Sequence, residues 1–303
     1  MVNTSVPLMG ELIALFVAFL WGLASIIWTA AGEKISPMEL NLIKAVAAIG
    51  LVGLALLITG AALTPLTGLS LTQMLLSGMV GIGMGDVALF AAFQKIGPTR
   101  TSMIKLLSPL LVSLVAFFSL SEKLTPVDLL GMVITIIGIL LVVSERLPHS
   151  QISPRNYWEG VGLALLATLA EVIGVVFSHQ VLVQTQLDPL WGTLLRLAAA
   201  AGFLALFAAL TRRRIGGWLH KPESGRLVRL IGAGVFCGTF IGLWLQQVVL
   251  KITAAGVAQT FFSATPLFIL LLQSLAQRHL PSPRALGGVL VSLAGVALIF
   301  LGG

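Results

Sequence analysis

The chain has 303 residues and a formal net charge of +7, and 57% of its residues are hydrophobic while only 10% are charged. Soluble proteins carry about a quarter charged residues, so this composition excludes a soluble globular protein and indicates one embedded in membrane lipid. Most bases stand in short loops between apolar stretches, where they report membrane topology rather than a nucleic-acid partner.

Ten apolar stretches are long enough to cross a bilayer, because a helix that rises about 1.5 Å per residue needs about 20 residues for the crossing. Helices are expected because backbone amides in lipid must pair within their own segment, and these runs lack the alternation of barrel strands. The predicted fold class is an all-α membrane protein with ten transmembrane helices, at residues 9–30, 36–58, 71–94, 98–120, 126–144, 158–182, 188–210, 227–250, 254–276 and 282–301.

The N-terminal stretch MVNTSVPLMGEL has no Lys or Arg before its apolar run and no small-residue cleavage site after it, so we expect no removable signal peptide. Across the expected loops, thirteen bases fall on one face and only Lys123 and Lys251 on the other. An excess of Lys and Arg marks the cytoplasmic side. The sequence therefore predicts a multi-pass protein of the cell (inner) membrane with both termini outside.

The third expected helix carries a ladder of small residues that recurs in the eighth. A shift of 157 residues places Ser77, Gly81 and Gly85 on Gly234, Gly238 and Gly242, and it also pairs Pro109 with Pro266 and Gly138 with Gly295. Gly and Pro are common in membrane helices, but chance does not hold one offset across three consecutive helices. Such ladders let backbones approach closely, as helices around a cavity must.

This repetition divides the chain into two halves. We predict a first five-helix repeat at residues 1–146, a linker at 147–157 and a second five-helix repeat at 158–303, with Lys44 matching Arg196 at a shift of 152. Because five is odd, the second repeat enters the membrane from the opposite face. Inverted repeats of this kind are typical of transporters whose site lies near the midplane. The cavity is expected between helices 1, 3, 4, 6, 8 and 9 of the ten.

Three stretches resemble the EamA-like branch of the drug/metabolite transporter superfamily. FLWGLASIIW (Phe19 to Trp28) resembles the first span of that family. LSPLLVSLVAFFSLSEKLTPVDLLGMVITIIGILLV (107–142) resembles its fourth span, acidic-basic turn and fifth span. TPLFILLLQSLAQRHLPSPRALGGVLVSLAGVALI (265–299) is the second copy, with His279 where the first has Glu122. The resemblance covers nearly the whole chain and implies the family's fold, while its diffuse motifs imply no particular substrate.

A shorter stretch, LAEVIG (Leu169 to Gly174), resembles the first helix of small multidrug resistance transporters. In those transporters the acid of the motif binds a proton and a cationic substrate in alternation, so the resemblance implies that Glu171 is the coupling residue. The matching region of the first half, Trp21 to Ala24, has no acid. The EamA-like family usually has its termini inside, whereas the loop charges of this chain predict them outside.

Five charged residues stand out because they fall deep inside expected helices: Lys44, Asp86, Lys105, Glu171 and Arg196. A charge at the bilayer centre costs about 2.5–3.5 kcal/mol on insertion scales, so each is a candidate functional residue. Counted along the helices, the first three lie roughly 10–13 Å from the basic face, and the last two lie roughly 12–16 Å from the opposite face. The side chains within each of these two groups could therefore meet one another. Structural pairing that locks helices is the alternative, because an unpaired buried charge is costly.

Polar residues follow helical spacing around these charges. Thr101, Ser102, Lys105 and Ser108 share a face of the fourth helix, Gln259 and Ser263 share one of the ninth, and Ser178 and His179 follow Glu171. We interpret Trp21 as a packing residue that could also line the cavity, and His179 as a hydrogen-bonded core histidine rather than a proton relay.

These observations predict a monomeric secondary transporter that exports or exchanges a small metabolite by alternating access. Three bases against two acids leave one positive charge, which the carboxylate of an amino acid or related compound would neutralise. The alternative is a proton-coupled multidrug cation exporter. In it Glu171 changes charge near neutral pH, because burial favours the neutral acid while a cation such as Arg196 favours the carboxylate.

Other function classes lack support in the sequence. The four histidines (His149, His179, His220 and His279) have no metal-site spacing, no nucleophile motif is visible, and Cys237 is the only cysteine. We therefore expect neither an enzyme nor a cofactor. A passive scaffold would need neither inverted repeats nor charges at matching depths, and without an ATP-binding loop a gradient or the substrate itself must supply the energy.

Overall fold

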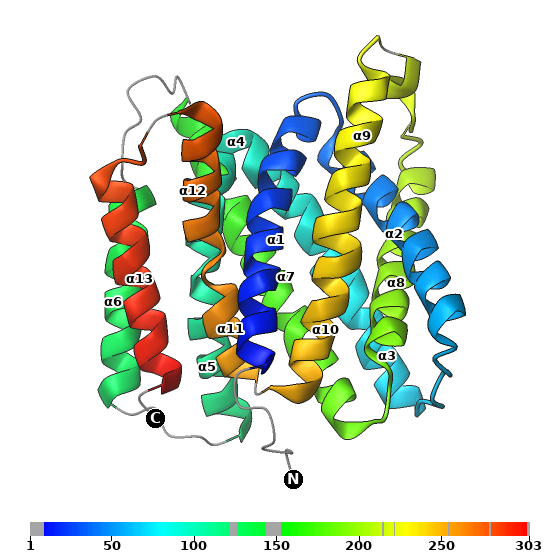
Figure 1. The fold of residues 1–303 in the computed structure, drawn as a ribbon, viewed down its shortest axis with the longest axis horizontal. Coiled ribbons are helices and arrows are strands. Elements are labelled where there is room, and N and C mark those ends of the chain that lie inside the picture. The colour runs from blue at the N-terminus through cyan, green and yellow to red at the C-terminus, as the bar shows by residue number, and fades with distance from the viewer. Residues whose placement is uncertain are drawn as a thin grey trace.

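The computed structural model describes residues 9–120, 126–143, 153–213, 215–220, 222–253, 255–278 and 280–301, and these residues form helices that stand side by side (Figure 1). Seven stretches are long and apolar enough to cross a membrane, and 129–142 and 283–298 are shorter apolar helices. The chain is thus an all-helical, multi-pass membrane protein over its described residues. The count of ten crossings stays a prediction.

The first half consists of α1 (Met9–Gly32), α2 (Pro37–Thr59), α3 (Gly68–Leu76), the π-helix η1 (Ser77–Met84), α4 (Gly85–Lys105), α5 (Leu107–Leu120) and α6 (Pro126–Val143). The second half consists of α7 (Pro154–Gln184), α8 (Pro189–Leu210), the 3₁₀-helix η2 (Gly217–His220), α9 (Ser224–Gly234), the π-helix η3 (Val235–Ile241), α10 (Gly242–Ile252), α11 (Ala255–Phe262), α12 (Thr265–Gln277) and α13 (Pro283–Leu301).

Three helices begin at a proline that directly follows a capping residue. Ser36 precedes Pro37 and accepts a hydrogen bond from the amide of Glu39, and Asp188 caps α8 in a similar way. Proline suits the first helical position because the amide hydrogen it lacks would have no partner there. Ser153 and Pro154 likewise begin α7 four residues before the predicted start at 158, inside the predicted linker. The rest of that linker, 147–152, lies outside the described residues.

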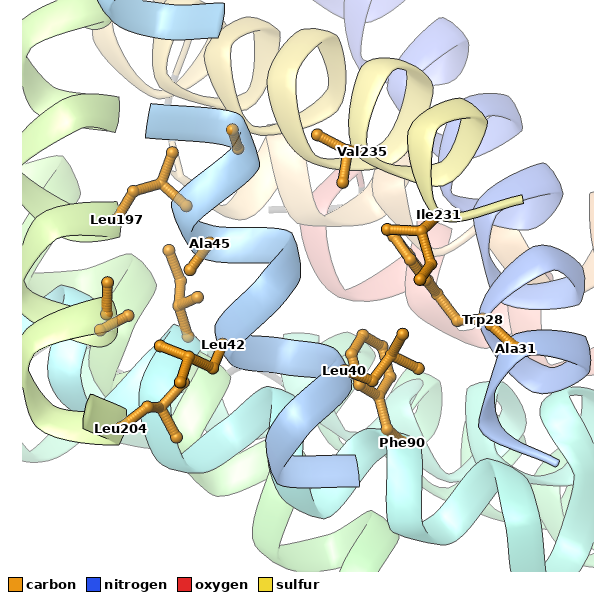
Figure 2. Packing of buried hydrophobic residues seen from close by; sticks show 14 of the residues in the cluster. Trp28, Ala31, Leu40, Leu42, Ala45, Phe90, Leu197, Leu204, Ile231 and Val235 are labelled. Atoms are coloured by element: carbon orange, nitrogen blue, oxygen red, sulfur yellow. The ribbon is translucent and has the colours of Figure 1, made fainter. Parts of the chain in front are cut away.

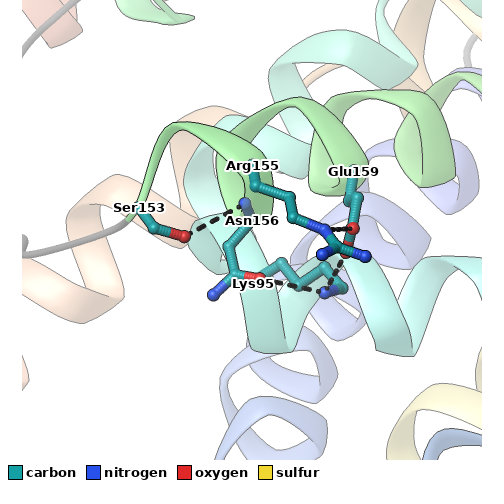
Figure 3. A network of polar contacts seen from close by, with 5 residues as sticks. All are labelled: Lys95, Ser153, Arg155, Asn156 and Glu159. Atoms are coloured by element: carbon teal, nitrogen blue, oxygen red, sulfur yellow. Dashed lines mark hydrogen bonds and ion pairs between the residues drawn. The ribbon is translucent and has the colours of Figure 1, made fainter.

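The extra turn of α7 is tied to α4 by a polar network (Figure 3). Glu159 accepts from Arg155 Nε at 2.8 Å and from Lys95 Nζ at 2.7 Å, and Lys95 also contacts Asn156. Arg155 is 88% exposed at its side chain. Charged residues therefore extend the helix beyond its apolar run, which is why hydropathy placed the start of α7 too late.

The third helix of each half contains a π-helical segment at the predicted ladder of small residues. η1 ends at Met84, directly before Gly85, and η3 ends at Ile241, directly before Gly242. A Cβ added at any ladder glycine would approach a neighbouring helix to 3.2 Å or less, at Gly81, Gly85, Gly234, Gly238 and Gly242. The ladders therefore allow close helix contacts, while the π-helical geometry is a feature that the spacing of small residues did not predict.

The fourth helix of each half is broken near its middle. A turn at Leu106 separates α4 from α5, and a turn at Ser263 and Ala264 separates α11 from α12. Each break stands just before one of the paired prolines, Pro109 and Pro266. Lys105 is consequently the last residue of α4. A separate interruption at Gly97 (φ 80°, ψ 164°) divides the third from the fourth predicted span.

Apolar side chains of both halves pack together in the interior of the bundle. The largest cluster joins α1, α2, α4, α8 and α9, and it includes Trp28, Phe90, Leu204 and Ile231 (Figure 2). The rings of Trp28 and Phe90 lie 5.6 Å apart. Figure 1 places the paired helices α6 and α13 at one side of the bundle.

Candidate functional site

A cavity of about 140 Å³ lies at the centre of the bundle, with room for on the order of ten water molecules. Its lining includes residues of α1, α4, α7, α10, α11 and both π-helices. These are the six predicted segments, and Lys44 of α2 and Arg196 of α8 join them. All five ionisable residues predicted inside the membrane line this one cavity: Lys44, Asp86, Lys105, Glu171 and Arg196.

The first ion pair joins Lys44 to Asp86, as the counting of depths allowed. The two side chains are hydrogen-bonded, and that of Lys44 is only 4% exposed. Lys44 Nζ also lies 5.1 Å from the centroid of the Phe90 ring, where a cation is attracted by the ring face. Burial, hydrogen bond and ring together fix this lysine in one position.

The second ion pair joins Lys105 to Glu171, with Nζ and Oε2 3.0 Å apart. Glu171 Oε2 forms no hydrogen bond with any described residue, so charge attraction rather than directional bonding holds the pair. Glu171 therefore pairs with Lys105, although the counted depths had grouped it with Arg196. Depth counting used backbone positions in straight helices, whereas Lys105 ends a broken helix and reaches Glu171 with a long, 26% exposed side chain.

Arg196 is the base left over. It is 4% exposed, and its Nη1 donates to Gln246 Oε1 at 3.3 Å. Its Nε has no hydrogen-bond partner, and no carboxylate of the described residues lies within 4.0 Å of the guanidinium. The surplus positive charge that the sequence predicted is therefore carried by Arg196.

Other cavity-lining polar atoms share this lack of partners. Ser108 Oγ and Gln259 Nε2 belong to side chains that are each 2% exposed, and neither atom has a hydrogen-bond partner among the described residues. Leaving a buried polar group unsatisfied costs about 1–3 kcal/mol, so such groups are rare. Together with Arg196 Nε, three such atoms line one cavity, which is the pattern of a site that binds a polar ligand.

Ser263 and Trp21 line the cavity as well. Ser263 donates to the carbonyl of Gln259 at 2.7 Å. Trp21 Nε1 donates to the carbonyl of Gly238 at 3.3 Å, and its ring lies 5.2 Å from that of Phe262. Trp21 thus packs helix α1 against the second half of the chain, and it also lines the cavity.

Ser178 and His179 lie outside the cavity lining. Ser178 donates to Gln247 Oε1 at 2.5 Å, and His179 Nδ1 lies 2.8 Å from the carbonyl of Leu250. A carbonyl only accepts, so Nδ1 carries the proton. Both residues join α7 to α10, which matches the interpretation of His179 as a hydrogen-bonded core residue.

Gln246, Thr239 and Phe262 also line the cavity and were not predicted from the sequence. Gln246 is a polar residue in an apolar helix, so its composition signal was present. Thr239 and Phe262 gave no signal of their own, because an isolated threonine or phenylalanine is ordinary in a membrane helix.

Comparison with known proteins gives three findings. A model of the EamA-like transporter family matches residues 8–144 and again 158–301. One solved crystal structure is similar over 96% of each chain with a TM-score of 0.72 and 18% sequence identity, a likeness that shows the fold alone. No curated protein sequence matches.

Proposed function

The chain belongs to the EamA-like transporter family, whose unit it contains twice, and we propose that it is a secondary transporter of an amino acid or related carboxylate. It is a membrane transporter of small solutes. The proposal adds that it works as an exporter or exchanger by alternating access, as a monomer, with the central cavity as its binding site.

One observation carries this proposal: Arg196 is buried in the cavity with no carboxylate partner among the described residues. A guanidinium presents donors in a fixed fork that matches a carboxylate, so a substrate carboxylate is the group that suits it. The amide of Gln259 and the hydroxyl of Ser108 supply further hydrogen-bonding groups in the same cavity. A substrate that binds there satisfies several buried polar atoms at once.

The alternative, a proton-coupled exporter of cationic drugs, has less support. Glu171 would bind the cation, but three bases and two acids line the cavity. A purely cationic substrate would enter a site that already carries surplus positive charge, whereas a zwitterion or an anion would not face that repulsion.

Two matched features support the proposal of inverted repeats at 1–146 and 158–303. Each repeat has a π-helical segment in its third helix and a break in its fourth, and the paired features border the cavity. Discontinuous helices of this kind are common at the midplane sites of transporters. The loop charges support a cytoplasmic location for the Arg212 to Arg229 loop. Gly303, predicted outside, lies beyond the described residues.

Transport by reconstituted vesicles tests the proposal. Uptake and efflux are measured with a panel of labelled amino acids and of organic cations, for the wild type and for Arg196→Gln. Loss of a hydrogen-bonded charge costs about 1.5–3 kcal/mol, so transport of the carboxylates falls about 10- to 100-fold. Arg155→Gln, which removes one positive charge from the exposed end of α7, is the matched control. Transport of organic cations alone, or equal transport by both variants, contradicts the proposal.

A further inference from the structure

The cavity contains two ion pairs that differ in how firmly they are held. Lys44 is hydrogen-bonded to Asp86, stacked on Phe90 and 4% exposed at its side chain. The side chain of Lys105 is 26% exposed, and it contacts Glu171 without a hydrogen bond to Oε2. The Lys44–Asp86 pair is therefore held firmly, whereas in the Lys105–Glu171 pair the acid can exchange its partner.

The position of Lys105 adds to this difference. It is the last residue of α4, directly before the turn at Leu106 that breaks the helix. A side chain at such a break has freedom that one in the middle of a packed helix lacks. Lys105 can therefore leave Glu171 and remain in the cavity without disturbing a helix.

The charged surroundings of Glu171 come from two neighbouring helices. Helix α4 contributes Lys105 and Asp86, with Lys44 of α2 already bound to Asp86, and α8 contributes Arg196. Helices α3, α5, α11 and the segment η1 pack against α7 but contain no charged residue. On α10, Lys251 donates to the carbonyl of Leu187, and His179 of α7 is bonded to Leu250. Lys105 is thus the cation that compensates Glu171.

We propose that Lys105 is the counter-cation of Glu171: it pairs with Glu171 while the cavity is empty. When a zwitterionic substrate binds, the ammonium group of the substrate replaces Lys105. This inference rests on the proposed function, in which Arg196 binds the carboxylate of the same substrate. The substrate's two charges then meet the unpaired base and the loosely paired acid. Lys44 and Asp86 remain bound to each other.

The energetic consequence concerns the return of the empty transporter. A bare carboxylate near the bilayer centre is costly, so the empty transporter needs a counter-charge for Glu171 before it can change conformation. Here Lys105 neutralises Glu171 without a proton. Net transport therefore proceeds without a proton gradient, and its rate stays level as the pH changes around neutrality.

The test separates exchange from net flux in vesicles that contain the full-length protein. The probe is a tritium-labelled mixture of the common amino acids. Exchange is measured with unlabelled amino acids on the opposite side, and net flux with none there, at about pH 6 and about pH 8, on either side of neutrality. Only net flux requires the empty transporter to return.

For Lys105→Gln, the ratio of net flux to exchange at about pH 8 falls at least about tenfold. The reason is that the empty transporter must then change conformation while the charge of Glu171 has no counter-charge. The double variant Lys105→Gln/Glu171→Gln keeps the wild-type ratio, because it leaves no carboxylate without a counter-charge. Lys105→Arg keeps the wild-type ratio. Arg155→Gln behaves as the wild type.

A second variant keeps the test valid if Lys105→Gln does not fold. In a Cys237→Ser background, Lys105→Cys is modified in the assembled protein with a methanethiosulfonate that carries either an ammonium or a sulfonate. The ammonium restores net flux and the sulfonate does not. Equal loss of exchange and net flux with an unchanged pH profile overturns the inference but leaves the proposed function intact. Wild-type vesicles that transport the probe in neither mode overturn both.

Discussion

The two repeats place a base at the same position and give it different partners. Lys44 and Arg196 each stand seven residues after the proline that begins their helix. In the first repeat, Asp86 directly follows the glycine after the π-helix and binds Lys44. In the second, the residue at that place is Leu243, and Arg196 has no acid partner among the described residues. The two repeats share these positions, while the proposed binding site lies at the position where they differ.

The largest effect is expected from removing one charge of the Lys44–Asp86 ion pair in the first repeat. Asp86→Asn leaves Lys44 buried without a counter-charge, and breaking a buried pair in this way costs about 3–5 kcal/mol. Thermal unfolding in detergent measures the loss. Lys44→Met/Asp86→Asn, which removes both charges, regains most of it. An Asp86→Asn variant as stable as the wild type would show that the first repeat does not depend on its pair.

The next prediction makes the second repeat resemble the first. Leu243→Asp adds an acid at the position that matches Asp86, and both Leu243 and Arg196 line the cavity. The new carboxylate competes with the substrate for Arg196, so carboxylate transport falls about 10- to 100-fold, the worth of a hydrogen bond to a charged group. Leu243→Asn is the matched control, because it adds a polar group of the same size without the charge. If both variants transport equally, Arg196 is not the carboxylate site.

The two acids of the cavity can be compared in the same stability assay. Glu171→Gln leaves behind Lys105, whose side chain is 26% exposed, whereas Asp86→Asn leaves behind Lys44, which is 4% exposed. A partly exposed lysine can turn to water, so Glu171→Gln lowers the free energy of unfolding by only about 1 kcal/mol. Its transport is impaired because the ammonium of the substrate loses its partner. A Glu171 variant that is destabilised as much as Asp86→Asn would make the glutamate a structural residue.

Much of this arrangement was predictable from the sequence, and what was missed has physical reasons. Hydropathy and one repeated offset predicted the all-helical membrane fold, the small-residue ladders and the five charges inside it, but in two separate groups rather than around one cavity. The choice of partner was not predictable, since it depends on side-chain reach and on the helix break beside Lys105. The early start of α7 was encoded by Ser153 and Pro154, but charged residues hid it from a hydropathy count.

The smallest effects are expected where the repeats have remained alike, at the contact between α6 and α13. Thr135 and Ser292 are 157 residues apart and fully buried, and each side chain is near the other's carbonyl. The Ser292 hydroxyl donates to Thr135 O at 3.2 Å, and the Thr135 hydroxyl lies 3.4 Å from Ser292 O and 2.9 Å from Gly131 O.

Thr135→Val and Ser292→Ala each remove a hydroxyl from this contact, so each lowers the free energy of unfolding by about 0.5–1.5 kcal/mol. Because the contacts are mutual, the two losses should agree within about 0.5 kcal/mol, and the double variant should lose less than their sum. Transport per folded molecule stays at the wild-type level, since neither residue lines the cavity. Unequal losses would mean that the repeats have diverged in their packing as well as in their charges, and would remove the reason for attributing the binding site to the charge difference alone.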